Sequence, residues 1–433
     1  MSRSIMNKML GVSIFGLLAM NVAAAQTIAI MNGKVHTAAG AVIENGDVII
    51  QDGRITQIGA DLSAPAGSVV IDASGKVVTP GIFSPYSSIG LVEVSAVADS
   101  NDSTPHEGFA LGAALDALDA YNPSSSLIAI NRTGGITRAL SAPGIGDTLF
   151  GGRAAVIDMS GKVNSVTKAN AAQVAVLGIG AAERNGGTRM GGWAVMREFL
   201  DEAQSYHANP NDYVQRPHDG RFAVSDLKAL GSVLEGEQPL MVRVDGANDI
   251  RNLIKLKDNY GLKVIIVGGA EAWLVADELS AANIPVIVDA LYNLPRQFEH
   301  LGATLKNAAR LNAAGVKISF FNPPGRGAHN LRYLTQMAGN AVSEGLPYDA
   351  AIKALTIYPA EMFGLESTLG SLQPNKIADV VIWDGDPLEV TVRPEVVFIN
   401  GQRQDLSNRQ TALRDRYRDL SRGDLPIAYR GGN

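Results

Sequence analysis

Few side chains in this sequence could carry out chemistry by themselves. The 433-residue chain has no cysteine, which excludes a thiolate nucleophile and any zinc–sulfur site. Its imidazoles are those of His36, His106, His207, His218, His300 and His329. His106 and His329 lie in polar loops, and Asp245 directly follows the apolar run LMVRV. Imidazole and carboxylate are the zinc ligands that remain, so these three residues could rebuild a metal site if the fold brought them together.

The same groups allow a metal-free alternative. Ser84 or Ser88 could form a serine–histidine–aspartate arrangement with His329 and Asp245. Neither serine lies in a G-x-S-x-G turn, so the sequence gives this alternative little support. The remaining histidines are expected in turns, in polar loops or on the surface of a helix: His36, His207, His218 and His300.

Strands and helices alternate in the centre of the chain and must position these groups. Short β-branched runs include AAVIDM, LMVRV, KVIIV, IPVIVDA and GVKISFF, and amphipathic stretches such as ANDIRNLIKLKDNYG lie between them. Alternation of this kind favours parallel βα units. Residues 81–365 are therefore predicted to form a TIM-like (β/α)8 barrel, whose functional loops lie at the carboxyl ends of the strands.

The flanking segments predict a small β-sandwich in two parts. Residues 26–80 contain short strands with hairpin-type dipeptides, and residues 366–405 return to the same pattern. These turn dipeptides are Asn32-Gly33, Asp52-Gly53, Asp384-Gly385 and Asn400-Gly401. Residues 406–433 are charged and polar, and we expect a surface tail with a helix. The predicted fold class is therefore α/β, a barrel plus a small β-sandwich.

The first residues predict export. Arg3 and Lys8 precede the apolar run MLGVSIFGLLAM, and Ala23 and Ala25 occupy small-residue positions before Gln26. This pattern is typical of a secretory signal peptide, residues 1–25, cleaved after Ala25. The mature protein is expected in the periplasm or the medium, away from the membrane. A net charge of −6 without a Lys/Arg-rich run argues against a nucleic-acid partner.

Three motifs resemble the amidohydrolase superfamily, specifically its imidazolonepropionase-like and prolidase-like secreted members. They are KVVTPG at the end of the first β-rich part, GGITRALSAPG at Gly134–Gly144, and YPAEMFGLESTLGSLQPNKIADVVIWDGDPL at Tyr358–Leu388. The last motif is long and specific, and the resemblance covers nearly the whole chain after Gln26. It implies the barrel-plus-sandwich fold and a hydrolase of carbon–nitrogen bonds in cyclic amides or dipeptides.

The resemblance also implies a metal at the barrel mouth, but this chain departs from the ligand pattern. The family has D-x-H-x-H after strand one, histidines on strands five and six, and an aspartate on strand eight. The corresponding residues here are Ser84, Tyr86 and Ser88, then Asp245, then Gly268 or Gly269, and finally Asn322. Hydroxyl and amide oxygens are poor zinc ligands beside imidazole. The standard metal centre is therefore predicted to be lost.

Two functions follow from this loss. The first is an amidohydrolase-type hydrolase with doubtful activity, in which Asp245 is the candidate catalytic residue. The alternative is a non-catalytic pseudoenzyme that binds a small molecule or pairs with an active paralogue. Candidate binding residues are Tyr86, Ser88, His106, Asn322 and His329. No metal or cofactor is assigned, and zinc is expected only if the site is rebuilt. Family resemblance alone suggests a homodimer.

Overall fold

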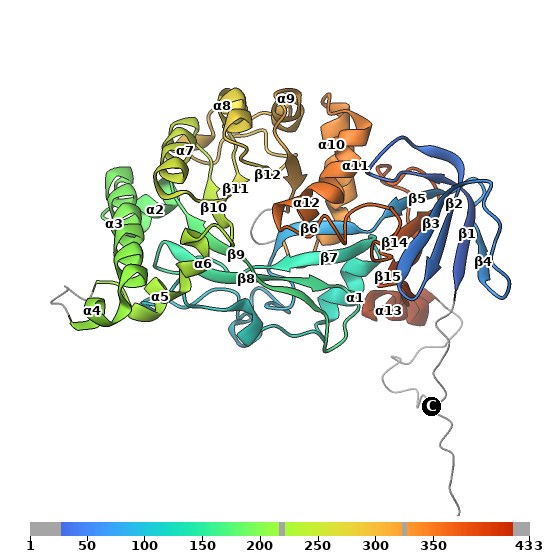
Figure 1. The fold of residues 1–433 in the computed structure, drawn as a ribbon, viewed down its shortest axis with the longest axis horizontal. Coiled ribbons are helices and arrows are strands. Elements are labelled where there is room, and N and C mark those ends of the chain that lie inside the picture. The colour runs from blue at the N-terminus through green and yellow to red at the C-terminus, as the bar shows by residue number, and fades with distance from the viewer. Residues whose placement is uncertain (1–26, 216–220, 323–326, 419–433) are drawn as a thin grey trace, which may run out of the picture.

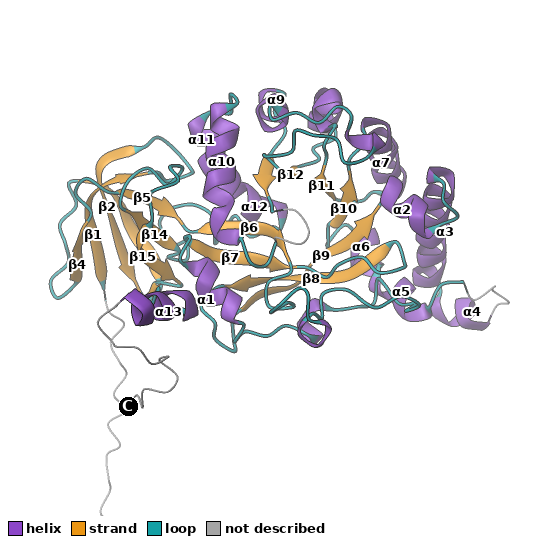
Figure 2. Ribbon diagram, turned by 180° about the vertical axis from the view of Figure 1, so that it is seen from behind, coloured by secondary structure: helices purple, strands orange, loops and turns teal. Residues whose placement is uncertain are grey.

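Two eight-stranded sheets organise the molecule (Figure 1). The computed structural model describes residues 27–215, 221–322 and 327–418. The predicted signal peptide and His218 lie outside these ranges. Within them, no helix is long and apolar enough to cross a membrane. In Figure 2 the barrel helices lie outside the barrel strands, and the second sheet lies at one end of the molecule.

The first sheet forms the barrel, with strands in the order β13-β12-β11-β10-β9-β8-β7-β6. The strands are β6 (Ile82–Ser87), β7 (Ile136–Ser141), β8 (Phe150–Asp158), β9 (Val166–Val176), β10 (Leu240–Val244), β11 (Val264–Gly268), β12 (Val286–Val288) and β13 (Ile318–Phe320). Strands β9 to β13 pair in parallel. Cα atoms of β13 come within 8 Å of those of β6, so the row of strands nearly closes.

Helices follow the parallel strands of the barrel, as the alternation predicts. The helices are α1 (Ser126–Arg132), α2 (Ile179–Arg184), α3 (Arg189–Ala208), α4 (Pro210–Gln215), α5 (Val224–Ala229), α6 (Gly231–Leu234), α7 (Ala247–Tyr260), α8 (Ala276–Ala281), α9 (Asn307–Ala313), α10 (Leu334–Ser343), α11 (Tyr348–Leu355), α12 (Ile357–Met362) and α13 (Arg409–Arg418). In α7 the buried Ile250, Leu253 and Leu256 recur every three residues and face the core.

Strand β8 departs from the all-parallel pattern. It contains most of the run AAVIDM and pairs antiparallel with both β7 and β9. β7 ends at Ser141 and β8 begins at Phe150, whereas β8 ends at Asp158 and β9 begins at Val166. A parallel connection needs about a dozen residues or more, usually including a helix. These short connections therefore produce an antiparallel meander within the barrel sheet.

The second sheet combines strands from both ends of the described chain. Its order is β16-β15-β14-β5-β1-β2-β3, with β4 also paired to β1. The strands are β1 (Ile28–Val35), β2 (Ile43–Gln51), β3 (Arg54–Ala60), β4 (Val69–Asp72), β5 (Val77–Pro80), β14 (Val380–Trp383), β15 (Pro394–Ile399) and β16 (Gln402–Arg403). The predicted fold class is confirmed: an α/β barrel accompanied by a sheet from the N- and C-terminal segments.

The turn dipeptides have two different outcomes. Asp52-Gly53 joins β2 to β3, and Asn400-Gly401 joins β15 to β16, so both hairpin predictions are confirmed. The prediction of a turn at Asn32-Gly33 was wrong, because both residues lie inside β1 where its pairing with β2 changes register. The Asn32 amide donates to Asp47 Oδ1 at 2.8 Å. Asparagine and glycine adopt positive φ readily, and a β-bulge can require this conformation just as a hairpin turn does.

Candidate functional site

A cavity of about 210 Å³ lies at the carboxyl ends of four neighbouring barrel strands. Among its lining residues, Asp245 directly follows β10, Gly268 ends β11, Asp289 follows β12 and Phe321 follows β13. Parallel strands bring their carboxyl ends to one edge, and TIM-barrel active sites lie at that edge. The position of the cavity makes it the candidate site.

Asp245 and His300 form the central contact of the cavity. His300 Nε2 lies 3.1 Å from Asp245 Oδ2, and the Ala270 amide donates to Asp245 Oδ1 at 3.1 Å. The Tyr292 hydroxyl contacts His300 Nδ1. Gln297 Nε2 also lies 3.1 Å from His300 Nε2, and in the tautomer in which Nε2 donates to the carboxylate instead of accepting from Gln297, Nδ1 is left to accept the Tyr292 proton. The three side chains therefore form a chain of hydrogen bonds along which a proton can be held or moved.

Tyr292 is the proton donor in this chain of hydrogen bonds. Burial raises the pKa of the Tyr292 hydroxyl, although the nearby Arg296 guanidinium acts in the opposite direction. That guanidinium lies 4.8 Å from the centre of the tyrosine ring. The phenol therefore stays protonated at neutral pH and can donate a hydrogen bond to His300 or to a bound molecule. An oriented imidazole beside a hydroxyl is an acid–base arrangement.

The carboxylate of Glu299 is buried in a network of its own. Its Oε2 accepts hydrogen bonds from the Ile179 amide at 3.1 Å and from Arg189 Nη2 at 3.2 Å, and its Oε1 accepts one from Gln297 Nε2 at 2.9 Å. Burial, above all, raises the pKa of Glu299, and the charge of Asp245 adds to this effect. The Ile179 amide and Arg189 partly oppose it.

Asp245, Glu299 and His300 are the one group in the described part of the chain that could hold a metal, with ligand atoms within 4.8 Å of one another. Metal binding requires free lone pairs. Here Glu299 is occupied by Arg189 and two other donors, and both nitrogens of His300 face protein groups. A metal ion would have to displace these partners. This donor set therefore does not fit a metal site as it is arranged.

The residues at the family's H-x-H position lie on or just after β6. The half-buried Tyr86 packs edge-on against Phe321, with ring centres 5.8 Å apart, and Phe321 lines the cavity. Ser84 is fully buried and its Oγ has no hydrogen-bond partner among the described residues. Ser88 is half-buried. An aromatic pair therefore stands beside the cavity where the family resemblance implies metal ligands.

The other predicted site residues lie apart from the Asp245–His300 contact. Asn322 is buried and donates to the backbone carbonyl of Asn330. His329 Nε2 lies 3.2 Å from Ser95 Oγ. His106 is exposed in its loop. Neither histidine belongs to the group of possible metal ligands. Their roles in binding stay predictions.

Sequence reasoning missed His300. The prediction that it lies on a surface helix was wrong: it ends a single 3₁₀ turn, Phe298–His300, and is 8% exposed. In the same turn Glu299 is buried, whereas Phe298 is 83% exposed. This burial is the reverse of what hydropathy predicts, so the local pattern holds no signal for the site. Only the tertiary contact with Asp245 reveals it.

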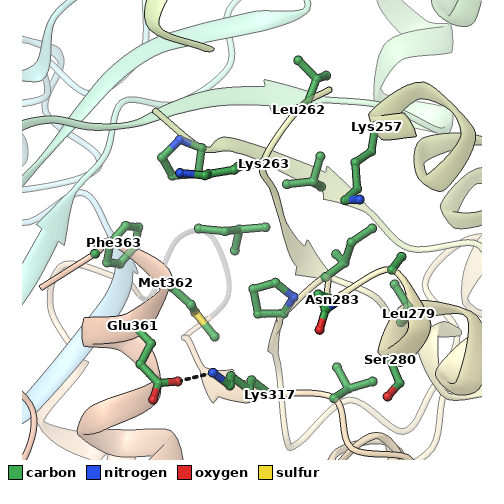
Figure 3. A pocket seen from close by; sticks show the side chains of 18 of the residues that line it. Lys257, Leu262, Lys263, Leu279, Ser280, Asn283, Lys317, Glu361, Met362 and Phe363 are labelled. Carbon is green, nitrogen blue, oxygen red and sulfur yellow. Dashed lines mark ion pairs between the residues drawn. The ribbon is translucent and has the colours of Figure 1, made fainter. Parts of the chain in front are cut away.

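A second cavity, of about 650 Å³, lies at the opposite ends of the strands (Figure 3). Lys263, Pro285 and Lys317 line it and directly precede β11, β12 and β13. Lys317 Nζ is paired with Glu361 at 2.6 Å. The amino ends of TIM-barrel strands usually serve stability. The smaller cavity at the carboxyl ends is therefore the better candidate.

Comparisons with known proteins agree with the fold. The model of the amidohydrolase family matches residues 248–404. A crystal structure of an amidohydrolase from Thermotoga maritima has a TM-score of 0.76 and 26% sequence identity, and the match covers 87% of this chain and 99% of that chain. The chain belongs to the amidohydrolase superfamily.

The relatives that match this chain over most of its length differ in their named activities. Amidohydrolase tasK from Hapsidospora irregularis is 24% identical over 83% of this chain, which spans 40% of tasK. A 5-methylthioadenosine/S-adenosylhomocysteine deaminase from Symbiobacterium thermophilum is 25% identical over 82% of this chain and 84% of its own length. The narrower resemblance to imidazolonepropionase-like and prolidase-like members of the superfamily stays a prediction.

Proposed function

We propose that this superfamily member binds a small molecule in the Asp245–His300 cavity and has lost the standard metal centre. One observation carries the proposal. The acids and the imidazole that cluster at the barrel mouth are held by protein donors and acceptors, while Ser84, Tyr86 and Ser88 stand where the family resemblance implies metal ligands. A cavity without a cation still offers charged and polar groups to a ligand.

Metal content tests the loss of the centre. The protein beginning at Gln26 is purified without chelator, analysed for metals, incubated with zinc, desalted and analysed again. We expect far less than one zinc or manganese per chain at both stages, because a metal would have to displace hydrogen-bonded partners. About one tightly held ion per chain would overturn the proposal. Asp245→Asn and His300→Gln would then identify the ligands.

A second candidate is hydrolysis of a carbon–nitrogen bond. The observation that favours it is the Asp245–His300–Tyr292 chain of hydrogen bonds, an acid–base arrangement beside a cavity. Cyclic amides and Xaa-Pro dipeptides are the substrates to screen. Turnover that Asp245→Asn abolishes would support the hydrolase over the binder. Turnover unaffected by this change would point to a contaminating enzyme.

Location and assembly are further parts of the proposal. Export follows from the signal-peptide pattern, and the mass of the purified protein would reveal cleavage after Ala25. Pairing with a second copy or with an active paralogue would account for a superfamily member without a metal. Light scattering measures whether two copies of the chain pair. Affinity purification from the native host tests for an active paralogue. A monomer without a co-purifying amidohydrolase would contradict both forms of pairing.

A further inference from the structure

Arg243 presents a positive charge to the candidate cavity. It lies on β10 two residues before Asp245, is half-buried and lines the cavity. Residues two apart on a strand point to the same side, about 7 Å apart. In the described part of the chain, the Arg243 guanidinium has neither an ion pair nor a hydrogen bond to a protein group. An unpaired guanidinium beside a cavity suits a carboxylate.

Asn307 lines the same cavity, but its side-chain oxygen is sealed from solvent. It begins α9, is 6% exposed and lines the cavity. Its Nδ2 donates to the Gly269 carbonyl at 2.8 Å, which fixes the orientation of the amide because a flipped amide would set two oxygens against each other. Its Oδ1 has no partner among the described residues. A buried acceptor without a partner is unusual, but a ligand in the cavity does not reach this oxygen as the side chains are arranged.

Asp245 supplies an accessible acceptor, and the size of the cavity limits the ligand. The Asp245 side chain is 24% exposed, so its carboxylate is accessible despite the contact with His300. The cavity has a volume of about 210 Å³. This lies below the ~300–1,000 Å³ of pockets for drug-sized ligands.

We propose that this cavity binds a zwitterion the size of a single α-amino acid. Its carboxylate lies on Arg243, and its ammonium group donates to Asp245. The inference rests on the proposed binding function and names the class of ligand. A free amino acid matches both the opposite charges and the small volume, whereas a ligand with only one charge leaves half of the site unsatisfied.

Calorimetric titration of the protein beginning at Gln26 tests the ligand class. The probes are the common L-amino acids, with propionate and ethylamine as partners that each carry one of the two charges of alanine. We expect at least one amino acid to bind with a millimolar or tighter Kd. Its carboxylate-only and amine-only analogues should bind at least about tenfold more weakly, since each lacks one charge-assisted contact.

Three variants locate the binding. Arg243→Gln should weaken amino-acid binding at least about tenfold. Arg251→Gln is the matched control, because Arg251 pairs with Glu278 on the helical outside of the barrel, and it should bind like the parent protein. Asp245→Asn should reduce the preference for the amino acid over its carboxylate-only analogue. Melting temperatures of all variants separate lost binding from lost folding.

The failures can be told apart. If no amino acid binds at about 10 mM, or if Arg243→Gln binds as well as the parent, the inference is overturned. If propionate binds as tightly as alanine, the zwitterion is overturned while a binding function stands. Metal retention in the separate zinc experiment would overturn the proposed loss of the centre without depending on amino-acid binding.

Discussion

Gly268 leaves the space that the Asp245 carboxylate occupies. Its φ is +100°, and a Cβ at this position would lie 2.5 Å from Asp245 Oδ1. That oxygen is also held by the Ala270 amide, so it cannot move away without losing a hydrogen bond. The absence of a side chain at Gly268 therefore shapes the cavity and allows the contact between Asp245 and His300.

Gly268→Ala should lower the free energy of unfolding by about 1–3 kcal/mol more than Gly261→Ala does. Gly261 is the matched control, because its φ is also positive, at +67°, but no atom lies within 4 Å of a Cβ built there. Both variants carry a backbone penalty, which is larger at +100° than at +67° because the left-handed region open to alanine lies near +57°, so the difference sums this extra strain and the clash with Asp245. Urea denaturation provides the values, and equal losses for the two variants would contradict this account.

The sequence could predict one half of the central contact. Asp245 follows an apolar run, and the end of such a run marks the end of a buried strand, where barrel sites lie. His300 could not be found in this way. It is brought to Asp245 by the path of the segment after β12, and that path depends on long-range packing. Residues on regular elements are therefore more predictable than residues on loops.

At the scale of elements, α5 holds the segment that follows the first barrel strand. Asp226 in α5 is buried and accepts hydrogen bonds from the amides of Gly112 and Ala114, at 3.2 and 2.7 Å. Burial raises the pKa of the Asp226 carboxyl above 3.8, although these amides partly oppose the effect. The folded protein therefore binds this proton more tightly than the unfolded chain does.

This sign gives a pH-dependent prediction. The stabilisation from a raised pKa is complete below the unfolded value of 3.8 and is lost as pH rises through the folded value. Relative to Asp226→Asn, which keeps an acceptor oxygen but cannot titrate, the parent protein should lose stability as pH rises from about 4. Urea denaturation at several pH values measures the difference, and a constant difference would refute the prediction.

Elements with a clear hydrophobic period were predictable. Whether each strand runs parallel or antiparallel to its neighbours was only partly predictable. LMVRV and KVIIV became β10 and β11, because short β-branched runs separated by amphipathic helices leave few alternatives. AAVIDM has the same composition but lies in the antiparallel β8. What decides direction is the length of the connections, and no helix separates this run from its neighbours.

At the scale of the whole molecule, one buried ion pair ties the barrel to the small sheet. Arg138 of β7 contacts Asp379 beside β14 through Nε at 2.6 Å and Nη2 at 3.1 Å. Burial disfavours the charge on Arg138, but Asp379 and Asp158 outweigh this effect and raise the pKa of Arg138. Both partners are at most 6% exposed. The two sheets are therefore joined by a charged pair that is almost completely shielded from water.

Asp379→Asn should reduce the free energy of unfolding by about 3 kcal/mol or more, because it leaves the buried guanidinium without its bidentate partner. Glu44→Gln, which removes the exposed Lys34–Glu44 pair, is the control and should change it by less than about 1 kcal/mol. Urea denaturation of both variants provides the comparison. A loss for Asp379→Asn as small as the control's would show that the buried pair is dispensable.

The pairing of β5 with β14 has a consequence for the order of folding. Val380 lies opposite Pro80, so the barrel is inserted within the small sheet. During synthesis β1 to β5 emerge first, yet the edge of β5 stays unpaired until β14 arrives at the far end of the barrel. An unpaired edge is a template for aggregation. The first strands to be synthesised are therefore among the last to be fully paired. Until β14 has been synthesised, the nascent chain exposes an unpaired strand edge that can aggregate.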